Sequence, residues 1–217
     1  MARAKRSMVL AAAALVALLA SAPAAAQKSG WYIGGGPGQT KADFATGDFT
    51  SLATGSYSAD DDAVAPRVFG GYRVAPNWAV EFGFTVFGRF KHTFQTGNTA
   101  AVYEYDASAL TTALAAHLPL GGGLSVNGRA GIAFTAANLR LAVDNGTATP
   151  RFCSDAWWYS DCTSTQTNLF WGLGLQFAIN PRWGIRLDYD NYGTIGDQFE
   201  SGRADMEQLS VNVLFNF

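Results

Sequence analysis

Hydrophobic and polar residues alternate one by one along most of the chain after residue 30. Over residues 169–179, the odd positions carry Leu, Trp, Leu, Leu, Phe and Ile, whereas the even positions carry Phe, Gly, Gly, Gln and Ala. The end of the chain repeats this pattern, with Leu209, Val211, Val213, Phe215 and Phe217 separated by mostly polar residues. A period of two is typical of a β-strand that has one apolar face and one small or polar face.

The alternation predicts eight strands and no helix of comparable length. They cover residues 30–43, 64–74, 78–89, 110–118, 124–136, 169–179, 183–191 and 208–217. The first two fit the pattern more loosely, and the first is interrupted by glycines and by Pro37. All eight have the composition of strands with two different faces.

The connections between these strands also alternate, in length. Three are short and cover residues 75–77, 119–123 and 180–182. Four are long and polar and cover residues 44–63, 91–101, 141–166 and 194–204. Short turns at one end and long loops at the other are typical of an outer membrane barrel.

Two folds could use such strands, and they differ in which face lies inside. A secreted β-sandwich buries the large apolar face, whereas a transmembrane barrel turns it to lipid and fills its interior with the small, polar face. Strand length suits a tilted span of about 9–11 residues. Aromatic residues near strand ends suit interfacial girdles; they are Trp31, Tyr72, Trp78, Trp183, Tyr189 and Phe217. The sequence therefore predicts an all-β, eight-stranded antiparallel transmembrane β-barrel with up-and-down topology.

Composition agrees with a membrane barrel. Of the 217 residues, 48% are hydrophobic, 13% aromatic and 15% charged, whereas soluble domains average about 25% charged residues. Such hydrophobicity excludes a disordered chain. After Ala20 there is no apolar run of the length that a transmembrane helix needs, about 18 residues.

The first residues have the pattern of a secretory signal peptide. Basic residues at the start precede an apolar stretch at 8–20 and then the small residues Ala24, Ala25 and Ala26. We expect residues 1–26 to be cleaved and residues 27–217 to form one barrel domain. Cleavage leaves 12 bases against 17 acids, a formal charge of −5, which argues against nucleic acid as a partner.

Two cysteines, Cys153 and Cys162, lie in one polar stretch. In an oxidising compartment they should form a disulfide, which would contribute at most about 3 kcal/mol because the loop is short. Zinc is the rival interpretation, but no histidine lies nearby; we expect no metal and no cofactor. Between the cysteines stand Trp157, Trp158 and Tyr159, which form either a contact surface or packing against loops and lipid headgroups.

Four segments resemble one known family. They are residues 69–74 (Phe-Gly-Gly-Tyr-Arg-Val), 76–84 (Pro-Asn-Trp-Ala-Val-Glu-Phe-Gly-Phe), 129–131 (Arg-Ala-Gly) and 186–189 (Arg-Leu-Asp-Tyr). In this order they resemble the OmpA-like eight-stranded outer membrane β-barrel family, over the whole mature chain. The resemblance implies a place in the bacterial outer membrane, in contact with its lipids and lipopolysaccharide. The terminal Phe217 resembles the signal read by the barrel-assembly machinery. The sequence stops at the barrel, so we expect no role in binding the cell wall.

Charged residues on the small, polar face should lie inside the barrel. The pattern points Glu81, Arg129, Arg186 and Asp188 inward, with Arg67, Arg73, Arg89, Asp190 and Gln176 at various depths. Because buried charges need partners, we expect Glu81, Arg129, Arg186, Asp188 and Gln176 to form a network that plugs the interior. Eight strands leave room only for side chains or a small ligand.

The resemblance also implies a departure from the family's interior. Glu81 and Arg186 match an interior ion pair of the family, but Gln176 and Ala115 stand where an acid and a lysine would be expected. A gate built on four exchanging charges therefore cannot be the same in this chain.

Three functions remain open at this point. The first is a structural or surface-interaction protein, with partners bound through the long loops; the second is a low-conductance porin. The third, a lipid A-modifying enzyme, is disfavoured because it needs a nucleophile beside a base. Only His92 and His117 are present, and neither begins the His-x-Ser-Asn pattern of the outer membrane deacylases. We expect no enzyme and no catalytic residue.

Overall fold

The computed structural model describes residues 30–44, 56–59, 62–96, 99–144, 161–197 and 203–217. Its strands are β1 (Trp31–Phe44), β2 (Ser56–Ala59), β3 (Asp62–Ala75), β4 (Trp78–Thr96), β5 (Thr99–Gly121), β6 (Leu124–Asp144), β7 (Asp161–Ala178), β8 (Trp183–Ile195) and β9 (Ala204–Asn216). Within these ranges, the chain forms no helix of the length and hydrophobicity required to cross a membrane.

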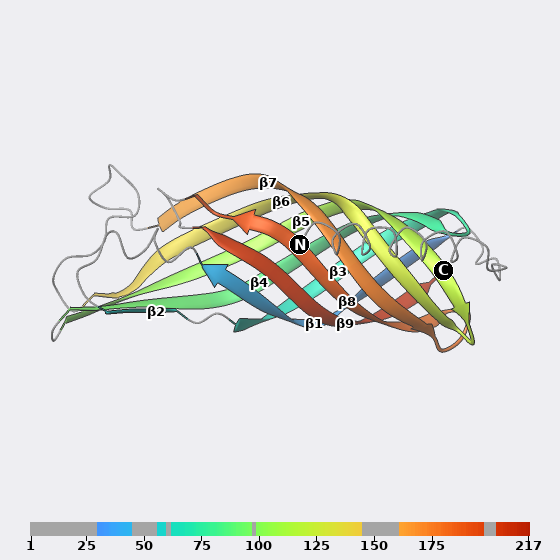
Figure 1. Cartoon of the computed structure of the whole chain (residues 1–217), viewed down its shortest axis with the longest axis horizontal. Coiled ribbons are helices and arrows are strands. Elements are labelled where there is room, and N and C mark those ends of the chain that lie inside the picture. The colour runs from blue at the N-terminus through green and yellow to red at the C-terminus, as the bar shows by residue number, and fades with distance from the viewer. Residues whose placement is uncertain (1–29, 45–55, 60–61, 97–98, 145–160, 198–202) are drawn as a thin grey trace, which may run out of the picture.

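Eight of the strands form a closed ring. Neighbouring strands pair antiparallel in the order β4, β3, β1, β9, β8, β7, β6, β5, and β5 pairs again with β4. The first and last strands of the chain, β1 and β9, therefore close the barrel side by side (Figure 1). The short β2 pairs with the outer part of β4, beyond the residues of β4 that pair with β3. The predicted fold class, an eight-stranded up-and-down barrel, is confirmed.

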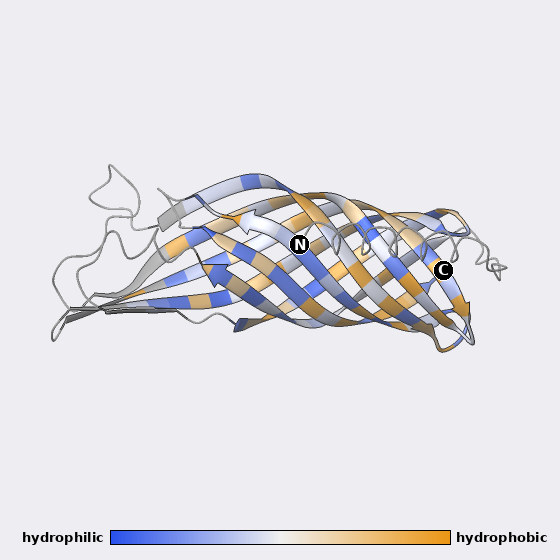
Figure 2. Ribbon diagram, in the orientation of Figure 1, coloured by the Kyte–Doolittle hydropathy of each residue, from blue (hydrophilic) through white to orange (hydrophobic). Residues whose placement is uncertain are grey.

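Side chains point alternately into the barrel and away from it. Along β8, exposed and buried residues alternate from Trp183 onward, and Figure 2 shows the same alternation of hydrophobic and hydrophilic positions across the ring. The exposed positions are the large apolar ones, such as Phe82, Leu173 and Val211. The buried positions are mostly small or polar. This arrangement is the reverse of a soluble protein and matches an outer surface that faces lipid.

Aromatic pairs lie on the outer surface at two levels. Near the short turns, the ring centroids of Trp31 and Tyr72 lie 5.0 Å apart, and those of Trp183 and Phe215 lie 4.9 Å apart. Farther toward the long loops, Trp171 lies 5.7 Å from Tyr189. These levels correspond to the interfacial girdles of a transmembrane barrel.

The strands reach farther toward the long-loop end than the sequence predicts. The stretch 91–101, expected to be a loop, belongs almost entirely to β4 and β5, so this prediction is wrong. Likewise β6 and β7 occupy both ends of the expected loop 141–166. Beyond the lipid-facing band, the two faces of a strand differ less in hydrophobicity. The alternation that indicates a strand is therefore weaker there. The short turns at 75–77, 119–123 and 180–182 are found within a few residues of their predicted places.

A bulge in β4 reverses the expected orientation of Arg89. The register with β5 shifts between Val86 and Arg89, and Gly88 has a φ of 85°. Phe87 and Phe90 are both buried as a result, whereas the Arg89 side chain is 54% exposed. The prediction that Arg89 points inward is therefore wrong, because a bulge inserts one residue and moves the following side chains to the other face.

Arg89 marks the end of the apolar band on β4. Its Nη1 lies 3.0 Å from Glu104 Oε2, and its Nε donates to Asp106 Oδ1 at 3.0 Å, both on the outer face of β5. Such an exposed ion cluster does not belong in hydrocarbon. The parts of β4 and β5 beyond it therefore lie outside the lipid-facing band.

Strand β1 approaches β9 so closely at Gly36 that one added methyl group should disturb their pairing. A Cβ added at Gly36 would lie 1.9 Å from the carbonyl oxygen of Val211 on β9, whereas a Cβ at Gly70 would be 3.7 Å from its nearest neighbour, Tyr32. We expect Gly36→Ala to lower the free energy of unfolding by about 1–3 kcal/mol and Gly70→Ala to leave it nearly unchanged. Urea unfolding in lipid vesicles measures both. Equal effects of the two variants would show that the strands separate freely.

Candidate functional site

The centre of the barrel interior holds a bidentate ion pair. Arg186 on β8 donates from Nη1 to Glu81 Oε1 at 2.8 Å and from Nη2 to Glu81 Oε2 at 3.1 Å, across the barrel to β4. Its Nε donates to Asp188 Oδ2 at 2.7 Å. The Tyr32 hydroxyl on β1 donates to Glu81 Oε1 at 3.0 Å. Arg186 thus binds two carboxylates at once, and both guanidinium edges are used.

A second set of ion pairs lies against the first. Arg129 on β6 places Nη1 3.0 Å from Asp188 Oδ1 and donates from Nη2 to Asp190 Oδ1 at 2.7 Å. Arg67 on β3 donates to Asp190 Oδ2, and its Nη1 lies 3.5 Å from Asp188 Oδ2. Arg129 Nη1 is also 3.9 Å from Glu81 Oε2. The two sets therefore form one network.

This network is electrically balanced and buried. It contains three arginines and three carboxylates, which we call the charge network; its members are Arg67, Glu81, Arg129, Arg186, Asp188 and Asp190. Their side chains are at most 3% exposed. Asn212 adds a hydrogen bond from Nδ2 to Asp188 Oδ2 at 2.9 Å. Each charge has an opposite charge within 4 Å, so none of the six is buried without a counter-charge.

The glycines of β7 make room for the charge network. A Cβ added at Gly172 would lie 2.0 Å from Asp190 Oδ1, and one at Gly174 would lie 2.2 Å from Asp188 Oδ1. The absence of side chains at these two positions of β7 therefore provides the space that the charged side chains of β8 occupy.

Four of the five residues expected in a lumen network are brought together. Glu81, Arg129, Arg186 and Asp188 are directly linked, as described above. Gln176 is buried and lies opposite Arg186 in the strand register, but its Oε1 has no hydrogen-bond partner among the described residues. Arg67 and Asp190, which the sequence pattern also places inside the barrel, complete the network. Tyr32 was missed because its strand fits the alternation only loosely.

A second layer of buried side chains lies on the long-loop side of the charge network. We call it the aromatic cluster; its large members are Phe44, Phe87, Phe90, Tyr105, Leu139, Phe170, Tyr192, Ile195 and Met206. Small residues fill the spaces between them, and the partly buried Ala63 of β3 packs against the cluster. Every strand of the ring therefore contributes to this layer.

Ring contacts hold the aromatic cluster together. Phe87 lies 4.7 Å from Tyr192, edge to face, and Phe44 lies 5.4 Å from Tyr105. Tyr192 also has polar partners, since its hydroxyl is 2.9 Å from Thr85 Oγ1 and donates to Gln208 Oε1 at 3.1 Å. These are the edge-to-face arrangements that aromatic rings prefer.

His92 borders the aromatic cluster outside the lipid-facing band. It follows Arg89 on β4 and packs edge to face on Phe44, with ring centroids 4.4 Å apart. Burial lowers the pKa of the His92 imidazole to about 4. The ring is therefore neutral at pH 7, as a member of an apolar layer should be.

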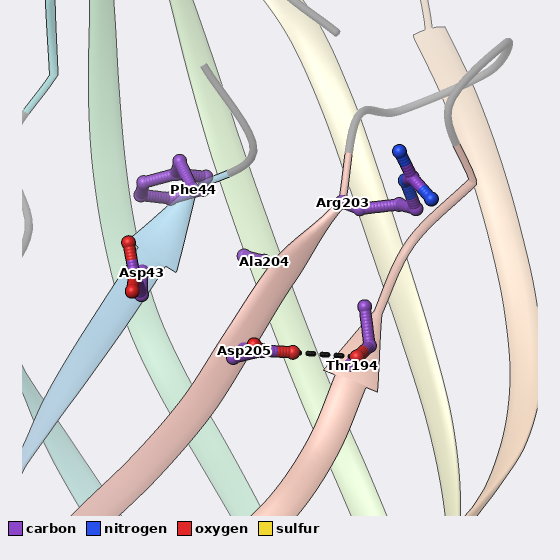
Figure 3. Close-up of a pocket in the computed structure, with 6 residues that line it drawn as sticks. All are labelled: Asp43, Phe44, Thr194, Arg203, Ala204 and Asp205. Carbon is purple, nitrogen blue, oxygen red and sulfur yellow. Dashed lines mark hydrogen bonds between the residues drawn. The ribbon is translucent and has the colours of Figure 1, made fainter. Parts of the chain in front are cut away.

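A pocket of about 330 Å³ lies at the long-loop end, beside the ends of β1, β8 and β9 (Figure 3). Its lining residues are Asp43, Phe44, Thr194, Arg203, Ala204 and Asp205. Thr194 donates to Asp205, and Asp43 faces Asp205 across the paired strands. Two carboxylates and one guanidinium fit many ligands equally, so the pocket does not identify one. Over the described ranges, no group of three or more His, Cys, Asp or Glu side chains is arranged to hold a metal ion.

The predicted surface site falls outside the described residues. Cys153, Trp157, Trp158 and Tyr159 all lie there, as does the predicted signal peptide. Cys162 belongs to β7, but its side chain is not described. The disulfide and the aromatic contact surface therefore stay predictions.

Residues 26–217 match the family model of the OmpA-like transmembrane domain. The chain belongs to this family. The sequence is 27% identical to outer membrane protein A of Salmonella typhi over 98% of this chain and 55% of that protein. It thus spans about half the length of the curated relatives it matches.

Solved structures share the fold. Neisserial surface protein A has a TM-score of 0.56 and 16% identity, with 87% of this chain and 98% of that one covered. The attachment invasion locus protein Ail of Yersinia pestis has a TM-score of 0.52 and 15% identity, with 88% of this chain and 100% of that one covered. Together with the family match, these relatives place this OmpA-like barrel in the bacterial outer membrane. The predicted family and location are confirmed.

Proposed function

We propose that this outer membrane protein is a barrel with a plugged lumen and a structural or surface-interaction role. The observation that carries the proposal is the presence of two filled layers in series, the charge network and the aromatic cluster. A conducting pore needs a continuous polar path, and each layer interrupts it in a different way.

The charge network opposes conduction because its charges are already paired. Arg186 alone makes three hydrogen bonds to two carboxylates. A passing ion would have to replace such bonds, and uncompensated buried charges are costly. The aromatic cluster adds a layer that offers an ion few polar groups, where the cost of desolvation is higher still.

A role at the cell surface is supported by the strands beyond Arg89. In β4 the residues from Phe90 to Thr96 continue past the lipid-facing band, which corresponds to a projection of about 20 Å along the strand. Strands β5 and β6 accompany them in Figure 1. We propose that this projection and the loops that follow it, including Trp157, Trp158 and Tyr159, contact partners outside the cell.

The remaining partners and the absence of catalysis are part of the same proposal. The outer aromatic girdles contact membrane lipids and lipopolysaccharide, and Phe217, which is 80% exposed, serves as the signal for the barrel-assembly machinery. His92 and His117 both point into the barrel and are buried, which is a poor position for a base that must reach a lipid. We therefore propose no catalytic residue.

Single-channel conductance in planar bilayers tests the plug. We expect refolded wild type to be silent, and Glu81→Ala to be silent too, because the aromatic cluster still closes the barrel. A variant that combines Glu81→Ala with Phe87→Ala and Phe90→Ala should pass ions in discrete steps. Heat-modifiable gel migration confirms folding of each protein before it is tested.

The alternative, a low-conductance porin, has one observation in its favour. Arg129 lies within 4 Å of Glu81 as well as of Asp188 and Asp190, so its ion pairs could exchange. Discrete conductance of the wild type that changes in Glu81→Ala would support this function and overturn the plug.

A further inference from the structure

The interior also contains polar side chains that the charge network leaves unpaired. They lie on the short-turn side of it, and they carry nitrogen and oxygen atoms with no hydrogen-bond partner among the described residues. These atoms are Arg73 Nε and Nη2, His117 Nδ1 and Nε2, Asn127 Oδ1 and Nδ2, and Gln176 Oε1. All four side chains are at least 95% buried. Buried polar atoms in proteins are nearly always bonded, to the protein, to water or to an ion.

Two of these side chains contact one tyrosine ring. The Arg73 guanidinium lies over the Tyr32 ring, 4.6 Å from its centroid, and the His117 ring meets the same ring edge to face at 6.3 Å. His117 and Asn127 are direct neighbours on the paired strands β5 and β6. The unpaired donors of Arg73, His117 and Asn127 therefore come from three strands, β3, β5 and β6, and we call the region around them and Tyr32 the inner chamber.

Arg73 differs from the other buried arginines in its partners. Arg67, Arg129 and Arg186 each lie within 4 Å of a carboxylate, whereas Arg73 has no carboxylate at that distance among the described residues. Its one side-chain hydrogen bond runs from Nη1 to the amide oxygen of Asn216, at 2.8 Å.

The buried side chains also carry unequal numbers of positive and negative charges. Four buried arginines stand against three buried carboxylates, a surplus of one positive charge in the described interior. A buried cation without a counter-charge is strongly unfavourable. The surplus can be assigned to Arg73, because the other three arginines are balanced within the charge network.

We propose that the inner chamber binds a small monovalent anion, of the size of chloride, on Arg73. The free Nε and Nη2 groups supply the charged donors, and one ring N–H of His117 and the side-chain amide of Asn127 supply further donors in the same region. A monovalent ion balances the single surplus positive charge, whereas a divalent oxyanion such as sulfate would replace it with a surplus negative charge.

The anion reaches the inner chamber from the periplasmic end. Asn216, the hydrogen-bond partner of Arg73, also donates to the carbonyl oxygen of Arg182 in the exposed turn between β7 and β8. Short turns of outer membrane barrels face the periplasm. Because this route stops below the charge network, the anion site is independent of whether the barrel conducts.

An NMR titration of the refolded barrel in detergent micelles tests the site. The Nε–Hε signal of Arg73 is followed as sodium chloride replaces sodium gluconate at constant ionic strength. We expect a shift that saturates for Arg73 and no saturating shift for Arg182, which is exposed. Sodium sulfate should not reproduce the saturation. If the Arg73 signal shifts linearly with chloride concentration, by the same amount as that of Arg182, the proposal is overturned. Water alone would then occupy the inner chamber.

Unfolding provides a second readout that does not need the assigned signal. Ligand binding to the native state raises the urea midpoint as the ligand concentration exceeds its dissociation constant. We expect chloride, relative to gluconate, to raise the midpoint of wild type and of the matched control Arg182→Gln, but not that of Arg73→Gln. If Arg73→Gln fails to fold, Arg73→Lys replaces it and should show a weaker response. An unchanged chloride response in the Arg73 variant would contradict the proposed site.

Discussion

Replacing Arg186 with alanine is expected to lower the free energy of unfolding by about 3–5 kcal/mol, the usual cost of removing one partner from a buried ion pair. The substitution removes three hydrogen bonds and leaves Glu81 and Asp188 with one fewer counter-charge each. Tyr32 can still donate to Glu81, but a hydroxyl does not neutralise a carboxylate. The charge network would then carry a net negative charge inside the barrel.

Urea unfolding in lipid vesicles, followed by tryptophan fluorescence, measures this effect. Arg182→Ala is the matched control, because Arg182 lies in an exposed turn beside the same strand and should change stability by less than about 1 kcal/mol. Arg186→Lys should fall between the two, since a lysine keeps the charge but cannot bind Glu81 in a bidentate manner. A loss below about 1 kcal/mol in Arg186→Ala would mean that water replaces the guanidinium and that the interior is open to solvent.

The outward and inward faces of most strands could be predicted from the sequence, because lipid demands an apolar outer surface. Glu81, Arg129, Arg186 and Asp188 all stand at inward positions of their predicted strands, and the structure places them inside. Arg89 is the exception, because the bulge at Gly88 turns its side chain outward. A single glycine gives no sign of this in the sequence, since many glycines of the chain lie in regular strands.

Partners inside the barrel could not be predicted to the same degree. Periodicity reveals the face on which a residue lies but not its height along the barrel axis, which depends on the stagger of the strands. Arg67 and Asp190 are 123 positions apart and on different strands, and only the closed ring brings them into contact. For the same reason, the surplus charge at Arg73 could not be recognised in the sequence.

The aromatic cluster was not predicted from the sequence. A barrel in lipid has large apolar residues outside and small or polar residues inside, and this pattern does not hold where the strands leave the lipid. Where the strands leave the lipid-facing band, their outer face meets water, and the interior must supply the hydrophobic core, as in a soluble barrel. Phe90 and Tyr105 lie in that part of β4 and β5. The same change of solvent explains why residues 91–101 resemble a loop in the sequence.

The stability of this core leads to the second large effect. Phe87 is fully buried and meets Tyr192 edge to face, so Phe87→Ala should lower the free energy of unfolding by about 3–5 kcal/mol through lost contacts and the cavity left behind. Phe87→Leu keeps most of the volume and should cost less than about 1.5 kcal/mol. Urea unfolding of both variants in vesicles gives the comparison.

The ratio between the losses of unfolding free energy in Phe87→Ala and Phe87→Leu distinguishes a tightly packed core from a loosely packed one. If the cluster is packed as tightly as a protein interior, the alanine variant must lose far more than the leucine variant, because the surrounding rings cannot collapse into the space. Similar small losses in both would mean that the rings already move past one another. A loosely packed layer would let water through, and the charge network alone would then have to close the barrel.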